Sequence, residues 1–301
     1  MTVSDLLTQN ETAVPPAPML ARRRGRMPTR SIVVGLVFLF WPLVVSLIAS
    51  LVVDPKLLRI AAAPPAAQPS AEHLLGADSA GRDILALIAQ GTPPTYLIGF
   101  LAGFVAVGIG TIVGMISGYA RGLVDSLLRG LVDVMLGIPA LAVAIIVAAL
   151  LGAISFVQLA FVIALLVWAY SARQIRSQVL SLREQPFVLM SRLSNQVPLS
   201  LIFRELLPNM LPFVTAAFVA SVSFSILLAV GLQILGLGSS ETTLGLVLQL
   251  AVTGGALSRG MWWWWGPPAV ILISMFIGLF LLSTSLDRLA NPRLREVGDD
   301  G

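Results

Sequence analysis

The sequence has no cysteine and only one histidine, His73, among its 301 residues. Disulfides, thiolate metal sites and histidine-rich metal sites are therefore excluded. Charge is also scarce, because only 11% of the residues are Asp, Glu, Lys or Arg, whereas soluble domains average about 25%. Together with a hydrophobic content of 57%, this composition indicates a membrane protein.

Signatures of common catalytic sites are missing as well. No GxxxxGK[ST] phosphate-binding loop occurs, and the single lysine, Lys56, lies in a predicted outer loop, so we do not expect the chain to hydrolyse a nucleotide. The HExxH and GxSxG motifs of metalloproteases and serine hydrolases are also absent. The predicted spans hold almost no ionisable side chain, which disfavours an ion-coupled carrier, because such carriers need charged groups inside the membrane.

Long uncharged runs predict an all-α membrane protein with six transmembrane helices. A span needs about 20 apolar residues, and Ser31–Val53 is too long for a signal-peptide core of about 7–15 residues. Pro93 and Pro94 are expected to divide the next run into a short interfacial helix, 84–91, and the second span. The six spans are predicted at 31–53, 96–118, 134–151, 156–170, 210–235 and 269–286, with a turn at 152–155.

The polar segments between the spans set the predicted organisation. We expect a flexible basic cytoplasmic tail (1–30), the first transmembrane helix (31–53), an extracytoplasmic segment with the interfacial helix (54–94), a five-helix core (95–286) and a cytoplasmic tail (287–301). Short loops are predicted at 121–133 and 236–260. The largest polar island, Ser171–Pro212, is interpreted as a cytoplasmic loop of short helices, with a coupling loop at 171–209.

Arginine is distributed unevenly between alternate polar segments. With the N-terminus inside, the inner segments hold 15 arginines and the outer segments hold four Lys or Arg, which predicts both termini in the cytoplasm. We interpret the basic cluster of the N-terminal tail as a topology anchor, with binding of anionic lipid or nucleic acid as the alternative. Trp262–Trp265 then fall at the outer interface, as an aromatic belt or, alternatively, a ligand platform.

Small residues recur every four positions along the second predicted span. Such repeats let helix backbones approach closely in lipid, although glycine is also common in membrane helices. We predict a packing seam formed by Gly99, Gly103, Gly110, Gly114 and Gly118.

A polar motif, HLLGADSAGRDIL, follows the first span at His73–Leu85. Its glycines suit tight turns, and its charged residues are expected to form a small network. The motif resembles the H-P-L-G-T-D-x-x-G-R-D-[VIL]-[LF] segment in permeases of the dipeptide, oligopeptide and nickel branch of ABC importers, with Leu74 and Ala77 in place of Pro and Thr. The matching residues are His73, Leu75, Gly76, Asp78, Gly81, Arg82 and Asp83.

The polar island resembles the E-A-A-x3-G-x9-I-x-L-P loop of ABC importer permeases in its second half. Leu189-Met190-Ser191 stand for E-A-A, and Asn195 stands for Gly. Asn favours a left-handed helix end and Pro favours a helix start, so a helix–turn–helix is expected. The resemblance implies an ATPase-docking loop in which Val188, Leu189 and Leu193 form an apolar face; its residues are Phe187, Val188, Leu189, Arg192, Leu193, Asn195, Pro198, Arg204, Leu207 and Pro208.

The last third of the chain is similar to the same branch in LGLG (Leu235–Gly238), Gly245-Leu246, Pro267-Pro268 and SLDRLANPRLR (Ser285–Arg295). The resemblance implies the type I ABC importer permease fold and the C-type subunit of a bacterial plasma (inner) membrane complex. The implied partners are a homologous B-type permease, one or two ATP-binding subunits, a substrate-binding protein and the lipid membrane, but no nucleic acid. It implies no cofactor, metal or catalytic residue in this chain, since ATP and magnesium would bind the partner ATPase subunits.

Peptides are the expected solute, and oligosaccharides or nickel are the alternatives that related permeases suggest. Two readings of another class stay open from the residues alone. One is an ion-coupled secondary carrier, and the other is a membrane scaffold that transports nothing.

Overall fold

The computed structural model describes residues 29–120, 122–186 and 202–290. Within these ranges the regular elements are helices, and no β-strand is present. The helices are α2 (Thr29–Val52), α3 (Ile84–Tyr119), α4 (Leu123–Gly137), α5 (Ala140–Leu151), α6 (Phe156–Leu182), α9 (Leu207–Ile234), α10 (Leu244–Thr253) and α11 (Trp262–Ala290), with a 3₁₀-helix η1 (Pro55–Leu58) and a π-helix η2 (Ile202–Leu206).

Five of the described helices are long and apolar enough to cross a membrane. They are α2, α3, α6, α9 and α11. Helices α4 and α5 would add a sixth span as a broken pair, bent by 77° at the break between them. The predicted fold class, an all-α membrane protein with six transmembrane helices, is therefore confirmed, with the α4–α5 pair as the sixth span. The third predicted span, 134–151, is not one straight helix, because the chain bends between Gly137 and Ala140.

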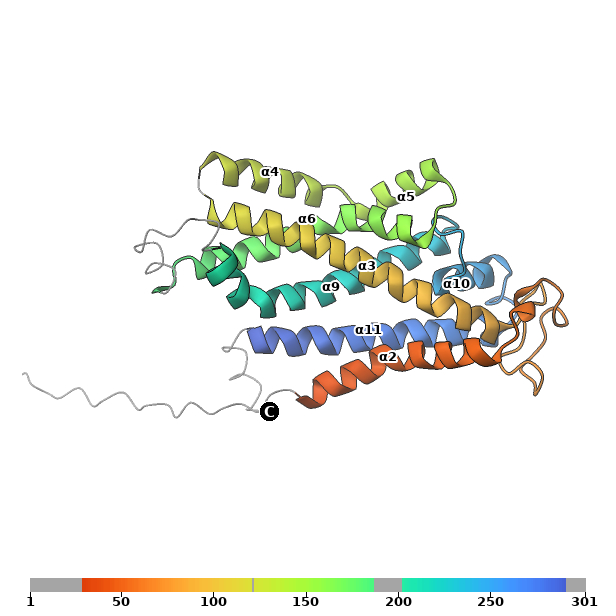
Figure 1. Cartoon of the computed structure of the whole chain (residues 1–301). Coiled ribbons are helices and arrows are strands. Elements are labelled where there is room, and N and C mark those ends of the chain that lie inside the picture. Colours follow the sequence, from red (N-terminus) through yellow and green to blue (C-terminus); the bar gives the residue numbers. More distant parts are fainter. Residues whose placement is uncertain (1–28, 121, 187–201, 291–301) are drawn as a thin grey trace, which may run out of the picture.

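The long helices run side by side, with α3 at the centre between α6 and α9 (Figure 1). Helices α2 and α11 pair along one side of the bundle, and α4 and α5 lie on the other side, beside α6. We call the end that holds the start of α9 and the end of α6 the inner end. The opposite end, which holds the segment 54–83, is the outer end, as the arginine distribution predicts.

The predicted break at Pro93 and Pro94 is wrong, because α3 runs without interruption from Ile84 to Tyr119. Proline is tolerated inside a membrane helix when a neighbouring side chain satisfies the carbonyl that loses its N–H donor. Ser46 on α2 does this for Ala89. No separate interfacial helix therefore precedes the second span.

Two predicted loop boundaries are also wrong. The segment 121–133 was expected to be a loop, but α4 begins at Leu123. The polar island was expected to start at Ser171, but α6 continues as a regular helix to Leu182. Arg176 and Arg173 of α6 pair with Asp125 and Asp133 of α4, so charge marks facing sides of two helices here and not the end of a helix. The predicted turn at 152–155 does separate α5 from α6.

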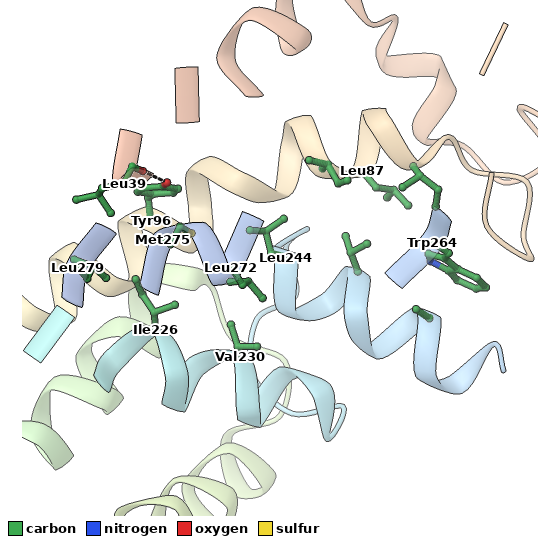
Figure 2. Close-up of a cluster of buried hydrophobic side chains, with 14 of the residues drawn as sticks. Leu39, Leu87, Tyr96, Ile226, Val230, Leu244, Trp264, Leu272, Met275 and Leu279 are labelled. Atoms are coloured by element: carbon green, nitrogen blue, oxygen red, sulfur yellow. Dashed lines mark hydrogen bonds between the residues drawn. The ribbon is translucent and has the colours of Figure 1, made fainter. Parts of the chain in front are cut away.

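A large hydrophobic cluster from α2, α3, α9, α10 and α11 lies between these helices (Figure 2). Trp264 is 1% exposed within it, and its ring lies over Gly254. Trp263 is also buried, whereas Trp262 is exposed. The predicted aromatic belt is therefore wrong for Trp263 and Trp264, whose rings close the core because α11 begins at Trp262 and not at residue 269.

Candidate functional site

The outer segment 54–83 is organised around the buried carboxylate of Asp78. Its Oδ1 accepts hydrogen bonds from the backbone N–H groups of Ala80 and Arg82, both at 2.8 Å. Its Oδ2 accepts from Nε of Arg82 at 2.7 Å. Because the Asp78 side chain has no exposed surface, these three bonds compensate its removal from water.

A second pair of side chains in the same motif, His73 and Asp83, lies at the start of α3. The carboxylate of Asp83 accepts from the N–H of Ala86 at 2.9 Å, as the N-cap of α3. Its other oxygen lies 2.9 Å from Nδ1 of His73. Of the expected network of Asp78, Arg82 and Asp83, the structure pairs Asp78 with Arg82, whereas Asp83 contacts His73 instead.

Both glycines of this motif adopt backbone angles that favour glycine, with φ of 71° at Gly76 and 75° at Gly81. They also lie against backbone, because a Cβ at Gly76 would fall 2.5 Å from the carbonyl oxygen of Ala67, and one at Gly81 would fall 2.4 Å from that of Ala63. The motif therefore folds the outer segment tightly back onto the start of α3. The backbone of segment 54–83 is therefore held in one conformation at the outer end of the bundle.

The glycines predicted to form a packing seam contact two different helices. Gly99 and Gly103 lie against Ile226 and Val222 of α9. Further along α3, the remaining glycines approach α6. A Cβ at Gly110 would fall 2.6 Å from Cβ of Ser171, and one at Gly114 would fall 2.7 Å from the carbonyl oxygen of Ala172. A Cβ at Gly118 would fall 2.7 Å from Cβ of Val179. The stripe therefore joins α3 to the two helices that flank the polar island.

Most of the predicted ATPase-docking residues lie outside the described residues, namely Phe187, Val188, Leu189, Arg192, Leu193, Asn195 and Pro198. Arg204 and Pro208 are exposed, and Leu207 is half-buried at the first residue of α9. Beside them Leu206 is fully buried in a cluster with Met115 of α3 and Ile175 and Val179 of α6. The end of the loop is therefore packed against the inner ends of three helices.

Ion pairs that sequence reasoning missed tie α4 to α6 at the inner end. Arg176 donates to both carboxylate oxygens of Asp125, at 2.8 and 2.9 Å, and Ser117 of α3 donates to the same carboxylate at 2.7 Å. One turn away, Arg173 donates to Asp133 at 2.6 Å. The four-residue spacing of Asp125, Arg129 and Asp133 was the available signal, because it places these charges on one helix face.

A groove of about 790 Å³ runs along α9 in the middle of the bundle. Its walls come from the α4–α5 break, α6, α9 and α11, and it is mostly apolar, with Tyr170, Ser223 and Ser283 as its polar side chains. A smaller, more polar cavity of about 340 Å³ shares Tyr170, Ala220 and Ser283 with it, and continues past Gln174 toward the inner end. The two cavities adjoin along α9 at these shared residues, and we call them together the α9 groove.

Residues 110–296 match the family described as "Binding-protein-dependent transport system inner membrane component". The match covers more than half of the 301-residue chain. The chain belongs to this family. It is thus a multi-pass protein of a bacterial inner membrane, and its family is one of transport permeases and not of enzymes. Membership of this permease family confirms the resemblance inferred from the sequence motifs.

Curated relatives of this permease carry names from the peptide branch. The chain is similar to the dipeptide transport system permease protein DppC of Alkalihalophilus pseudofirmus, with 32% identity over 171 residues, 57% of this chain and 56% of that protein. It is similar to the glutathione transport system permease protein GsiD of Escherichia coli O157:H7, with 31% identity over 175 residues, 58% of this chain and 57% of that protein. The chain thus spans a little more than half the length of the curated relatives it matches.

Proposed function

We propose that this chain is a permease subunit of an ATP-driven importer that forms half of a translocation path for peptides. The observation that carries the proposal is the α9 groove in a chain of this permease family. The groove starts in the middle of the bundle and reaches the inner end beside the polar island. A homologous B-type permease would complete the path by packing against it.

The energy source is proposed to lie in separate subunits. The charged side chains of the groove are confined to its inner end, where Asp287 lies, so its apolar middle offers no group that would carry a coupling ion. ATP and magnesium would be bound by one or two partner ATPase subunits, and a substrate-binding protein would deliver the solute to the outer end. The names of DppC and GsiD favour a peptide as that solute.

The inner-end contacts support a mechanical role for the loop. Leu206 joins the end of the loop to α3, α6 and α9, and α6 and α9 form two walls of the α9 groove. A partner that pulls on the loop would therefore move groove walls directly. Such a two-state element fits alternating access, in which the helices swing between inward-open and outward-open arrangements.

The test is charge substitution on the predicted apolar face of the loop. Val188→Asp, Leu189→Asp and Leu193→Asp should detach the ATPase from the affinity-purified complex and abolish ATP-dependent dipeptide uptake in proteoliposomes. Ile60→Asp is the matched control, since this outer-segment side chain is 75% exposed. Normal co-purification and uptake in the loop variants would contradict the proposal, and uptake driven by an ion gradient without ATPase would favour a secondary carrier.

A further inference from the structure

A cavity of about 230 Å³ lies between α3, α4 and α6 near the inner end of the bundle, separate from the α9 groove. Three arginines line it, namely Arg129, Arg173 and Arg176, together with a single carboxylate, that of Asp133. One water molecule occupies about 30 Å³ in the liquid, so the cavity has room for several waters or for one phosphate group. Its lining is therefore basic, and its size fits a small oxyanion.

The ion pairs around this cavity leave one positive charge uncompensated. Arg176 is paired with Asp125, and Arg173 donates to Asp133 at 2.6 Å. Nε of Arg129 lies 4.0 Å from the other carboxylate oxygen of Asp133, and the Arg129 guanidinium makes no hydrogen bond within the described part of the chain. Three guanidinium groups thus face two carboxylates.

A long apolar groove lies on a neighbouring flank of α3. It has a volume of about 720 Å³ between α3 and α9, and its polar side chains are those of Thr111 and Thr215. It extends along α3 from Phe104 to Ile116, which is about 18 Å at the helical rise of 1.5 Å per residue. The hydrocarbon of one leaflet is about 15 Å thick, half of the whole core. The groove thus has the length of an acyl chain that reaches from the inner interface to the middle of the bilayer.

The groove and the cavity border the same edge of α3. Ile112 and Ile116 line the groove, and the residues that follow them, Val113 and Ser117, line the cavity. Consecutive residues of an α-helix are about 100° apart around its axis, so the two spaces approach each other along this edge. Ile112 is 62% exposed and Ile116 is 43% exposed. The edge between the two spaces is therefore open to lipid.

We propose that an anionic phospholipid of the inner leaflet binds along this edge, with its phosphodiester in the basic cavity and one acyl chain in the apolar groove. The single negative charge of phosphatidylglycerol matches the uncompensated positive charge beside Arg129. Basic pockets between transmembrane helices on the cytoplasmic side are general binding sites for lipid head groups. The inference goes beyond the proposed transport function and does not depend on the solute.

Such a lipid would link helices that also form the walls of the α9 groove. Its head group would contact α4 and α6, and its acyl chain would contact α9. Because α6, α9 and the α4–α5 break line the α9 groove, an occupied lipid site would restrain those walls.

Other occupants account for only one of the two spaces. A free phosphate ion fits the basic cavity but leaves the apolar groove empty. An apolar helix of a partner protein would cover the groove but would not supply the negative charge that the cavity favours. A phospholipid fills both, because it carries an anionic head group and an apolar chain of the right length.

The test uses the intact complex, purified through a tag on this chain and reconstituted into phosphatidylcholine vesicles. These vesicles contain a small share of phosphatidylglycerol with a photoreactive diazirine at the end of one acyl chain. After irradiation, the lipid adducts are mapped by mass spectrometry. The same probe with a phosphatidylcholine head group tests recognition of the charge, and added inorganic phosphate tests a free anion as the ligand of the cavity.

Two variants alter the two halves of the site separately. Arg129→Gln removes the uncompensated charge and leaves the two shorter ion pairs in place. Gly108→Phe fills the groove, which Gly108 lines, and a Cβ at this position meets no atom within 4 Å. The matched controls are Arg259→Gln, at an exposed arginine of the outer end, and Gly130→Phe, at an exposed helical glycine that also has open space around it.

We expect adducts within 104–116 or 207–218 in the wild-type complex. Arg129→Gln should lower them about fivefold, the loss expected for one arginine beside an anionic lipid, and Gly108→Phe should lower them at least as much. Both controls should leave them unchanged. Absence of adducts from both ranges, equal labelling by the phosphatidylcholine probe, or displacement of the lipid by inorganic phosphate would overturn the site. Dipeptide uptake by the same vesicles tests the proposed transport function separately.

Discussion

The hydroxyl of Ser46 on α2 donates a 2.7 Å hydrogen bond to the carbonyl of Ala89 on α3. In a regular helix this carbonyl would accept from the N–H of residue 93, four positions later. Residue 93 is proline and has no N–H to donate. Ser46 and Ala89 are both buried, so the serine satisfies an acceptor that neither the helix nor solvent would otherwise reach.

The same arrangement occurs a second time on α2. Pro42 lies inside that helix and deprives the carbonyl of Phe38 of its donor. Ser274 on α11 donates to this carbonyl at 2.8 Å and accepts from Nε1 of Trp41 at 2.6 Å. Two serines thus link α2 to α3 and to α11 at proline-induced gaps, which explains how α2 joins the bundle with few polar groups.

Replacement of Ser46 by alanine should lower the free energy of unfolding by about 1–2 kcal/mol, because it leaves a buried carbonyl unpaired. In a Pro93→Ala background, where residue 93 supplies its own N–H, the same replacement should cost clearly less. The measurement is a double-mutant cycle by unfolding in mixed micelles. Ser50→Ala is the control, since the exposed Ser50 hydroxyl bonds within α2. An equal cost of Ser46→Ala in both backgrounds would refute this account.

Hydropathy was sufficient to predict the membrane class and the places of the five long helices, because burial in lipid depends on composition over about 20 residues. It could not predict the continuity of α3. Whether Pro93 ends a helix depends on the hydroxyl of Ser46, which lies on α2, 43 positions before the acceptor residue Ala89, and a single sequence does not show that pairing. The buried ring of Trp264 was missed for the same reason, since α10 covers it.

The candidate site was predictable where local geometry dominates. The turns at Gly76 and Gly81 are encoded within a few residues, and the structure contains both. The α9 groove was not predictable, because its walls come from helices far apart in the chain. The pairing of α4 with α6 was missed because charge was taken as a loop signal, although Asp125 and Asp133 lie two helical turns apart.

The two ion pairs between α4 and α6 should differ in their contribution to stability. Arg176 and Asp125 are 21% and 23% exposed and share two hydrogen bonds, whereas Arg173 and Asp133 are 57% and 52% exposed. Arg176→Met should therefore cost about 2 kcal/mol of unfolding free energy, and Arg173→Met less than about 1 kcal/mol. Chemical unfolding of both variants at low and high salt measures this difference. A larger cost for Arg173→Met would be inconsistent with the burial argument.

Removal of the buried charge at Asp78 should loosen the outer segment. Asp78→Asn replaces an acceptor by an NH₂ group that faces donors, and we expect a loss of about 3 kcal/mol, as for the breaking of a buried pair. Limited proteolysis should then cut within 54–83 faster than in the wild type. Asp54→Asn is the control, because Asp54 is exposed and caps only the short η1. Equal cleavage of the two variants would show that Asp78 does not hold the segment.

Close approach of α3 and α6 can be tested with two glycines of the same helix. A Cβ at Gly114 would fall 2.7 Å from the carbonyl oxygen of Ala172 and 3.0 Å from Cβ of Ile175, so α6 would have to move. Gly108 is exposed and has no atom within 4 Å of such a Cβ. Gly114→Ala should thus destabilise the protein by about 1–3 kcal/mol, while Gly108→Ala should be neutral or stabilising by up to about 1 kcal/mol, since alanine favours the helix. Thermal unfolding of the two variants in the same detergent compares them directly. If both alanines shift the midpoint equally, α3 and α6 are not in backbone contact at Gly114, and the glycine stripe reflects composition and not packing.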